Sequence, residues 1–377
     1  MAKDSRLVGG TFKEESAILV VKVFRLGKDF LKAKMVEFPR NVIAGHDVLK
    51  DVKDVCVNIH SGRVGTIITG ENTDKAAGQA VKQCLDGYDI DTCITGNATV
   101  ENIEYVKKRI IENKSTFILA VGGGSKIDIA KIASLDLNIP FISIPTSAAH
   151  DGIASNRASI KSETGSKSIE GASPMGVIAD TGIIFNAPYR ALASGCADVL
   201  SNFSSLRDWK LAYNLRDEDF SRSAYSFAMF AAESMMDASD YIRPNLEESV
   251  WLAIKPIIVS GISMCIARSS RPTSGSEHMI SHTIDMMYPG SAMHGEQCGV
   301  AAIVTSYLQK GDWEELKHAL LKIGAPTQAS EIGLSDEEFI EAVANAHKIR
   351  KDRYTILGDK GIPRDVIEDV CIRTGVI

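Results

Sequence analysis

Three of the chain's eight histidines lie within one segment, SGSEHMISHTIDMMYPGSAMHGE (274–296). His278 and His282 are four residues apart, so they share one face if this stretch is a helix. His294 follows beyond the turn YPGS, where we expect a loop. The HExxH motif of zinc proteases does not fit, because Met279 stands where that motif needs its glutamate. Two histidines at this spacing are often only hydrogen-bonded side chains, so metal binding and a structural role both stay open.

A catalytic divalent ion usually also needs a carboxylate and one position open to water or substrate. Asp198, in SGCADVLSN, is one candidate, and we expect it at the start of the first long helix in the second half of the chain. Glu277, Asp285 and Glu233 compete with it. Spacing alone does not choose among these four acids.

A second group of residues suits an anion. In AVGGGSKIDIAK (120–131), a predicted strand ends in three glycines and a helix begins at Ser125. Glycines let the backbone approach a ligand closely, and the first-turn amides of a helix donate to anions such as a pyrophosphate. The segment lacks the GxGxxG spacing, and a plain tight turn would look the same. However, the next predicted strand also runs into small and polar residues, TSAAHDGIAS (146–155). Two such neighbouring strand ends predict a ligand crevice at the carboxyl edge of a parallel sheet.

The elements that must position these residues follow from hydrophobic periodicity. Apolar runs predict strands at 64–69, 91–95, 116–121 and 140–145, alternating with helices at 74–86, 99–114 and 125–135. This alternation is typical of βαβ units with a parallel sheet. After about residue 185 the pattern becomes helical, and Ser276 is predicted to cap the histidine helix. We therefore predict an α/β domain with a Rossmann-like parallel sheet (1–187), an all-helical domain (188–377) and an active site in the cleft between them.

Composition narrows the class of protein. The net charge of −6 argues against a general nucleic-acid binder, which would show a basic face. Seven cysteines without a CxxC pair predict reduced thiols in a cytoplasmic protein. The N-terminus does not have the architecture of a signal peptide, and the longest apolar runs are shorter than the ~20 residues that a membrane span needs.

Five motifs occur in a fixed order: GGGSKIDIAK, PTSAAHDG, SGCADVLS, GSEHMISH and AMHGEQCG. Together they resemble the superfamily of iron-containing alcohol dehydrogenases, glycerol dehydrogenases and dehydroquinate synthases, over roughly residues 35–350. Within it, RPTSGSEHMISH and PTSAAHDGIAS are most similar to the sn-glycerol-1-phosphate dehydrogenases. The resemblance implies NAD(P)- and metal-dependent, reversible reduction of dihydroxyacetone phosphate to sn-glycerol 1-phosphate, the glycerophosphate backbone of archaeal-type ether lipids.

The resemblance also assigns residues. It implies a metal held by Asp198, His278 and His294, and substrate contacts and catalytic roles for His282, Asp151 and Asp198. The implied cofactor-binding residues are Gly122, Gly123, Gly124, Ser125, Lys126, Ile127, Asp128, Thr146, Ser147, Ala148, Ala149 and Ser155. Simpler interpretations remain for two of these residues, since Ser155 could cap a turn and Asp151 could be an ordinary turn acid.

The cofactor is NAD or NADP. Glu71 could accept a ribose hydroxyl, whereas Thr73 and Lys75 could tolerate a 2′-phosphate. Two histidines and a carboxylate suit zinc, iron or nickel, and the family favours zinc. Relatives assemble as dimers or larger homo-oligomers.

The substrate phosphate needs basic groups or helix amides. Candidates are Arg157, Lys161, Lys167 and Arg271, each of which could equally be a solvated surface charge.

Three rival functions remain open at this stage. A glycerol dehydrogenase would act on the unphosphorylated alcohol. A dehydroquinate synthase-like lyase would need an acid-plus-lysine arrangement, which SGCADVLSN does not contain. A non-catalytic sensor with the fold of a dehydrogenase would have lost a metal ligand, and the three implied ligands are all in the sequence.

Overall fold

A parallel sheet forms the first half of the computed structural model, which describes residues 36–59, 61–162 and 165–377, without the side chains of 162–166. Among the described residues the sheet has six strands in the order β1-β8-β5-β4-β2-β3. Their bounds are β1 (Asn41–Gly45), β2 (Val64–Thr69), β3 (Asp89–Ile94), β4 (Phe117–Gly122), β5 (Phe141–Pro145) and β8 (Gly176–Asp180). The predicted strands and the parallel α/β fold are confirmed, whereas β1 and β8 were not predicted.

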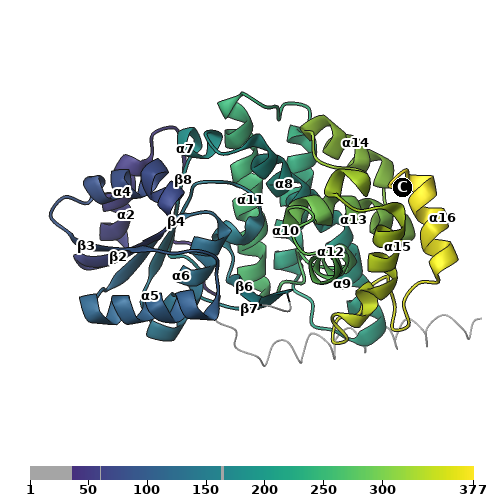
Figure 1. Ribbon diagram of the computed structural model, residues 1–377, viewed down its shortest axis with the longest axis horizontal. Coiled ribbons are helices and arrows are strands. Elements are labelled where there is room, and N and C mark those ends of the chain that lie inside the picture. Colours follow the sequence, from purple (N-terminus) through teal and green to yellow (C-terminus); the bar gives the residue numbers. More distant parts are fainter. Residues whose placement is uncertain (1–35, 60, 163–164) are drawn as a thin grey trace, which may run out of the picture. The chain divides into compact units, whose positions relative to one another are not determined.

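Helices cover both faces of this sheet (Figure 1). The two faces form separate apolar clusters, one that includes residues of α5 (Val100–Asn113) and α6 (Gly124–Leu137), and one that includes residues of α2 (Val52–Asn58) and α4 (Gln79–Cys84). The central strand β4 is therefore buried along its whole length, as expected for a strand covered on both sides. Shorter helical segments complete this half: η1 (Leu49–Asp51), α3 (Glu71–Thr73), the π-helical η2 (Asp74–Gly78) and α7 (Thr181–Phe185).

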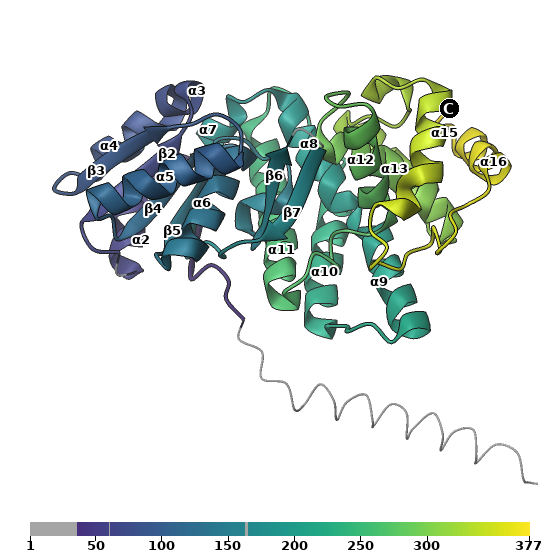
Figure 2. The ribbon, with the colours of Figure 1, turned by 60° about the horizontal axis from the view of Figure 1, so that its bottom comes forward.

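A two-stranded hairpin follows the sheet strand β5. It consists of β6 (Arg157–Ser162) and β7 (Gly165–Glu170), and the 3-10 turn η3 (Asp151–Ala154) leads into it. The hairpin packs against α6 on one side and against the histidine helix α12 (Ser276–Met287) on the other. It therefore links the sheet to the helical half, as Figure 2 shows.

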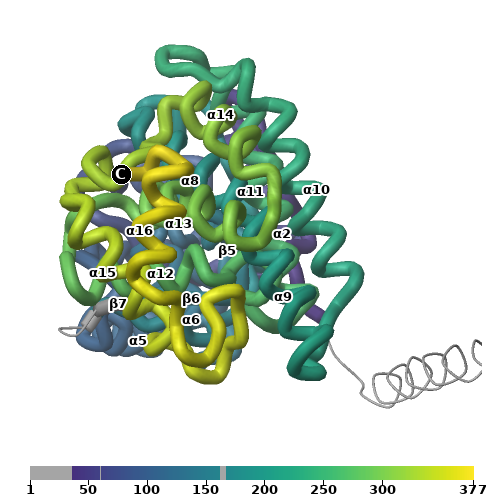
Figure 3. The backbone as a smooth tube through the Cα atoms, turned by 90° about the vertical axis from the view of Figure 1, so that its right-hand side faces the viewer, coloured from purple at the N-terminus to yellow at the C-terminus, as the bar shows by residue number. Residues whose placement is uncertain are grey.

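Beyond Asp180 the described residues contain helices and no strand (Figure 3). The other long helices are α8 (Tyr189–Leu200), α9 (Asn202–Arg216), α10 (Arg222–Ala238), α11 (Glu247–Ala267), α13 (His294–Leu308), α14 (Trp313–Ile323), α15 (Asp336–Asn345) and α16 (Arg364–Thr374), with short turns η4 (Ser330–Ile332) and η5 (Ala346–Lys348). Residues 37–377 form one compact unit, so the 187/188 domain boundary stays a prediction. The N-terminal segment that we examined for a signal peptide lies mostly outside the described residues.

Helix α11 alone among the described residues is long and apolar enough to cross a membrane. However, 61% of its most apolar window is buried inside the protein, which is typical of a core helix.

Three local predictions were wrong. Asp198 lies in the last turn of α8 and not at a helix start, because the helix is interrupted at Ser201 and α9 begins at Asn202. Gly275, not Ser276, is the N-cap of α12, and the Ser276 hydroxyl is buried without a partner. His294 is the first residue of α13 instead of a loop residue.

Candidate metal and substrate site

Three glycines let helices of the second half pack closely, two of them against the segment that follows β5 and one against α8. A Cβ at Gly195 of α8 would lie 2.0 Å from the carbonyl oxygen of Ala148, and one at Gly261 of α11 would lie 2.4 Å from that of Asp151. A Cβ at Gly295 of α13 would lie 2.0 Å from the carbonyl oxygen of Ser194. Any side chain at these positions would push the backbones apart. The glycines therefore let α8, α11 and α13 converge beside the end of β5.

This close packing brings Asp151 next to the carboxylate of Asp198. The Asp151 amide donates to Oδ2 of Asp198 over 3.0 Å, and the Ser260 hydroxyl donates to Oδ2 of Asp151 over 2.8 Å. Both carboxyls are buried, with exposed fractions of 8% for Asp151 and 3% for Asp198. Burial raises the pKa of each, and the neighbouring Asp198 charge raises the pKa of Asp151 further. Two buried acids held this way need a cation or a proton nearby.

The orientation of His278 is fixed by the residue before it. Oε1 of the buried Glu277 lies 3.0 Å from Nδ1 of His278 and also accepts the Gly275 amide over 2.6 Å. Because this oxygen acts as an acceptor, Nδ1 of His278 carries the hydrogen. The lone pair of its Nε2 is then free, and Nε2 lies 3.7 Å from Oδ1 of Asp198.

His294 is oriented by a chain of three polar side chains. The Asp285 carboxylate accepts from Nε2 of Gln297 over 3.0 Å, which turns the amide oxygen toward Ser281. The Ser281 hydroxyl donates to that oxygen over 2.7 Å, so its own oxygen accepts the hydrogen of Nδ1 of His294 at 3.1 Å. Nε2 of His294 is thereby left unprotonated, 3.9 Å from Oδ1 of Asp198.

Three acceptor atoms therefore converge without a hydrogen between them: Oδ1 of Asp198 and the Nε2 atoms of His278 and His294. Burial lowers the pKa of both histidines, which keeps the imidazoles neutral and ready to ligate. Mutual repulsion of buried lone pairs is relieved by a cation, so the site fits a divalent metal. The structure thus brings the predicted metal ligands together; of the competing acids, Glu277 and Asp285 serve the histidines and Glu233 is exposed.

Cys298 is also close to this cluster. Its Sγ lies 3.6 Å from Nε2 and 3.9 Å from Nδ1 of His294, so the sulfur sits alongside the ring. A sulfur that shared a metal with Nε2 would lie far from Nδ1, because the Nε2 lone pair points away from that atom. Cys298 therefore packs against the ring of His294 instead of facing the metal position.

The structure places His282 next to the metal trio but not in it. Its ring centroid is 6.3 Å from that of His278 and 5.8 Å from that of His294. Its Nδ1 is buried without a hydrogen-bond partner among the described residues. An unpaired buried nitrogen is rare in folded proteins and usually meets a ligand or a water. His282 is therefore available to a substrate on the metal.

The predicted cofactor segments meet at the carboxyl edge of the sheet. The chain passes from β2 outward to β3 and returns to β4 on the other side of β2, so the strand order reverses between β4 and β2. Gly122–Gly124 follow β4 at this switch point, where open α/β sheets bind ligands. A Cβ at Gly123 would lie 3.3 Å from Oγ of Ser147, and one at Gly124 would lie 2.2 Å from Nε2 of His150. The glycine loop and the segment after β5 are therefore adjacent.

Four of the predicted cofactor residues have other partners. The side chain of Ile127 is in the core. Asp128 accepts from the buried Lys131 over 3.1 Å and from the Ser159 amide over 3.1 Å, so it fastens the hairpin to α6. The Ser155 hydroxyl accepts the Arg157 amide over 3.3 Å, as expected of a residue that caps a turn. The Lys126 ammonium donates to the Gly96 carbonyl. The amides of the glycine loop, the side chain of Ser125 and Thr146–Ala149 remain the groups best placed for a cofactor.

Arg271 was one candidate for the substrate phosphate. It is 3% exposed, its Nε and Nη2 pair with the Glu218 carboxylate, and its Nη1 donates to the Tyr354 carbonyl over 3.0 Å. Its donors are therefore occupied within the protein. Lys161 and Lys167 are exposed on the hairpin.

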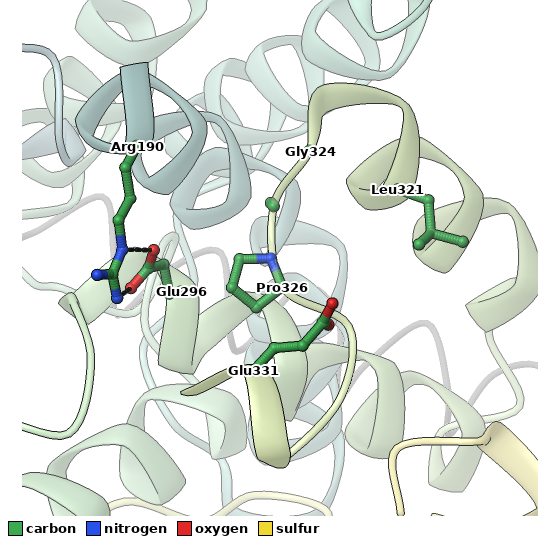
Figure 4. Close-up of a pocket in the computed structure, with 7 residues that line it drawn as sticks. Arg190, Glu296, Leu321, Gly324, Pro326 and Glu331 are labelled. Carbon is green, nitrogen blue, oxygen red and sulfur yellow. Dashed lines mark hydrogen bonds and ion pairs between the residues drawn. The ribbon is translucent and has the colours of Figure 1, made fainter. Parts of the chain in front are cut away.

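A separate pocket of about 390 Å³ opens on the helical half (Figure 4). In it, the Arg190 guanidinium forms two hydrogen bonds with the Glu296 carboxylate, of 2.5 and 2.7 Å. The pocket is lined by Arg190, Glu296, Leu321, Gly324, Ala325, Pro326 and Glu331, none of which is a predicted site residue.

Comparison with known proteins defines the class. Residues 43–188 match the family model described as iron-containing alcohol dehydrogenase. The fold is similar to that of a probable glycerol dehydrogenase from Sinorhizobium meliloti (TM-score 0.72, 18% identity, 91% of this chain and 98% of that chain). It is also similar to glycerol dehydrogenase from Schizosaccharomyces pombe (TM-score 0.74, 17% identity, 91% and 90%). The fold and the family-model match together indicate the iron-containing alcohol dehydrogenase class.

Curated sequences define the family within that class. A protein from Methanosarcina mazei named glycerol-1-phosphate dehydrogenase (NAD(P)+) is 46% identical over 347 residues, which are 92% of this chain and 97% of that protein. One of the same name from Picrophilus torridus is 45% identical over 350 residues, 93% and 100% of the two chains. The chain belongs to the family of NAD(P)+-dependent glycerol-1-phosphate dehydrogenases.

Proposed function

We propose that this protein reduces dihydroxyacetone phosphate reversibly to sn-glycerol 1-phosphate with NADH or NADPH. The observation that carries the proposal is the convergence of Asp198, His278 and His294 on one position, beside the unpaired His282 and at the cofactor edge of the sheet. Membership of the glycerol-1-phosphate dehydrogenase family supports the same substrate. The product would supply the backbone of archaeal-type ether lipids.

Each of the chain's own residues has a role in this reaction. Asp198, His278 and His294 would hold the ion, which when bound supplies a Lewis acid for the ketone oxygen. Asp151, fixed by Ser260 and the Asp198 contact, would orient the substrate hydroxyl. The nicotinamide supplies the hydride, and the protein positions its ring through the glycine loop and Thr146–Ala149.

His282 would act on the oxygen at which the proton is gained or lost. Its unpaired Nδ1 can hydrogen-bond the substrate without giving up a bond within the protein. Burial and the neighbouring His294 lower its pKa well below 6.5, so the neutral ring would accept the proton of the substrate hydroxyl in the oxidation, and the protonated ring would return it to the oxygen in the reduction.

Zinc is the proposed metal. One carboxylate oxygen and two imidazole nitrogens suit zinc, iron and nickel alike, so the choice of zinc rests on the family resemblance. Either cofactor is proposed because Glu71, Thr73 and Lys75, at and just after the end of β2, include both an acid for a ribose hydroxyl and a base for a 2′-phosphate. We further propose a cytoplasmic homo-oligomer, a dimer or larger, in which 1–187 binds the cofactor and 188–377 the metal.

The deciding experiment is oxidation of NADH and NADPH by the purified protein with dihydroxyacetone phosphate, followed by chiral analysis of the product. We expect turnover that is lost after chelation and restored by Zn²⁺, with sn-glycerol 1-phosphate as the product. Formation of the 3-phosphate enantiomer, or full activity in the metal-free protein, would refute the proposal.

The nearest rival is a glycerol dehydrogenase. It predicts equal or better rates with dihydroxyacetone than with its phosphate, so the same assay with both ketones separates the two functions. A dehydroquinate synthase-like lyase would consume no NADH.

A further inference from the structure

Arg157 is held by its backbone while its guanidinium is left unpaired. It is the first residue of β6, and its carbonyl accepts from the buried Lys131 over 2.6 Å while its amide donates to the Ser155 hydroxyl. Its guanidinium makes no hydrogen bond or ion pair with any other described residue, although its Nε is buried. A half-buried cation with an unused buried donor is costly unless an anion binds there.

A second arginine, whose charge is only weakly neutralised by a neighbouring acid, lies near Arg157. Arg350 follows η5 and is 28% exposed, and its one ion pair among the described residues is with the 74%-exposed Asp352 at 3.4 Å. Burial lowers the pKa of Arg157, and the charge of Arg350 lowers it further, whereas Glu170 opposes the shift. The two guanidiniums therefore repel each other, and the Glu170 carboxylate, which lies opposite Arg157 on the paired strand β7, attracts Arg157.

Arg157 is in a hairpin that packs on the helix of His282, and Arg350 follows the short turn η5, which packs on the same helix. The hairpin contacts α12 through β7, the strand that pairs with β6, and η5 also contacts α12. The charge of Arg350 also contributes to the low pKa of His282 and His278, although burial is the largest cause. These contacts place the two arginines on segments that flank the helix of His282.

The other buried arginines nearby are occupied. Arg271 pairs with Glu218, and Arg353 donates to the Ser274 carbonyl and the Ser270 hydroxyl. Arg157 and Arg350 instead combine partial burial with donors that the described residues leave unpaired or pair only with an exposed acid.

We propose that Arg157 and Arg350 together bind the phosphate of the substrate and select phosphorylated over unphosphorylated ketones. The inference rests on the proposed function, since it places the phosphate of a three-carbon ketone whose carbonyl lies at the metal trio. Two guanidiniums match the two negative charges of a phosphate and offer planar, bidentate donors.

The test is a comparison of Arg157→Gln and Arg350→Gln with wild type and with Arg364→Gln as a matched control. Arg364 is a surface residue of α16 that pairs with Glu337. Initial rates of the metal-loaded enzymes give kcat and KM for dihydroxyacetone phosphate, dihydroxyacetone and the cofactor, and inorganic phosphate serves as a competitive inhibitor. Loss of a charge-assisted pair should raise the KM for dihydroxyacetone phosphate about 10- to 100-fold and weaken phosphate inhibition similarly. The constants for dihydroxyacetone and for the cofactor should stay within about twofold of wild type.

The outcomes separate this inference from the proposed function. Equal increases in KM for both ketones, or no change for either, would overturn the phosphate site while wild-type turnover still supports the dehydrogenase. If wild type does not reduce dihydroxyacetone phosphate, the proposed function fails, and phosphate binding by calorimetry then tests the arginine pair alone. Arg157→Lys keeps the charge and should recover part of the affinity; a lysine variant no better than the glutamine variant, at equal melting temperature, would count against the pair.

Discussion

Replacing His282 with glutamine should abolish turnover and leave metal binding intact. The imidazole makes no hydrogen bond through Nδ1 to the described residues, and its ring lies beside those of His278 and His294 without sharing their contact to Asp198. Its removal therefore takes no ligand from the ion and no bond from the fold. If His282 exchanges the proton of the substrate oxygen, kcat should fall by about 10²- to 10⁴-fold. That loss corresponds to about 2.7–5.4 kcal/mol of transition-state stabilisation.

The assay measures three quantities on the same preparations. Metal content by elemental analysis, metal affinity by competition with a chromophoric chelator, and kcat with saturating dihydroxyacetone phosphate are compared for wild type and His282→Gln. His318→Gln serves as the control, because His318 is an exposed histidine on α14. We expect metal affinity within about threefold of wild type, since no direct ligand is removed. A glutamine variant that loses the metal would make His282 a ligand, and one that keeps full turnover would remove it from the chemistry; either result would refute the reasoning.

Three further predictions concern residues other than His282. His278→Ala and His294→Ala should each lose the metal and the activity together, which elemental analysis and the rate assay measure on one sample. Ser281→Ala should weaken metal affinity about 10- to 100-fold, because the ring of His294 loses the contact that orients it. The control Ser306→Ala removes a buried hydroxyl of α13 that has no partner among the described residues, and it should leave metal affinity unchanged. Equal effects of the two substitutions would show that the Ser281 contact has no orienting role. Arg271→Ala should lower the free energy of unfolding by about 3–5 kcal/mol, because it removes the partner of Glu218 from a largely buried ion pair. Denaturant titration measures this loss, and the KM for the phosphorylated ketone should not change selectively.

Hydrophobic periodicity was enough to predict the parallel sheet and its order along the chain. β2, β4 and β5 are buried apolar runs of strand length between helices with clear turn signals, so their bounds agree within a residue or two. β1 was missed because NVIAG is short and only partly buried, as expected of an edge strand that pairs with β8 alone. Its role depends on a partner far along the chain, which no local pattern reveals.

The site was predictable only in part. The shared helix face of His278 and His282 follows from their spacing, but the choice of Asp198 among four acids required the family resemblance, because α8 and α12 meet only in the tertiary structure. The orienting residues were missed, although a signal existed. Ser281 is three residues after His278 and Gln297 is three after His294, which puts each one helical turn from a predicted ligand.

The three glycine contacts have a consequence for the life of the protein in a cell. Asp198, His278 and His294 come from α8, α12 and α13, and they meet only after α8 and α11 have docked on the segment after β5 and α13 has docked on α8. An ion that binds this finished arrangement and not the unfolded chain stabilises the fold, by about 4 kcal/mol at a thousand times its dissociation constant. Metal shortage should therefore abolish the activity of the protein and also make it more susceptible to proteases. Its abundance should then follow the supply of the ion.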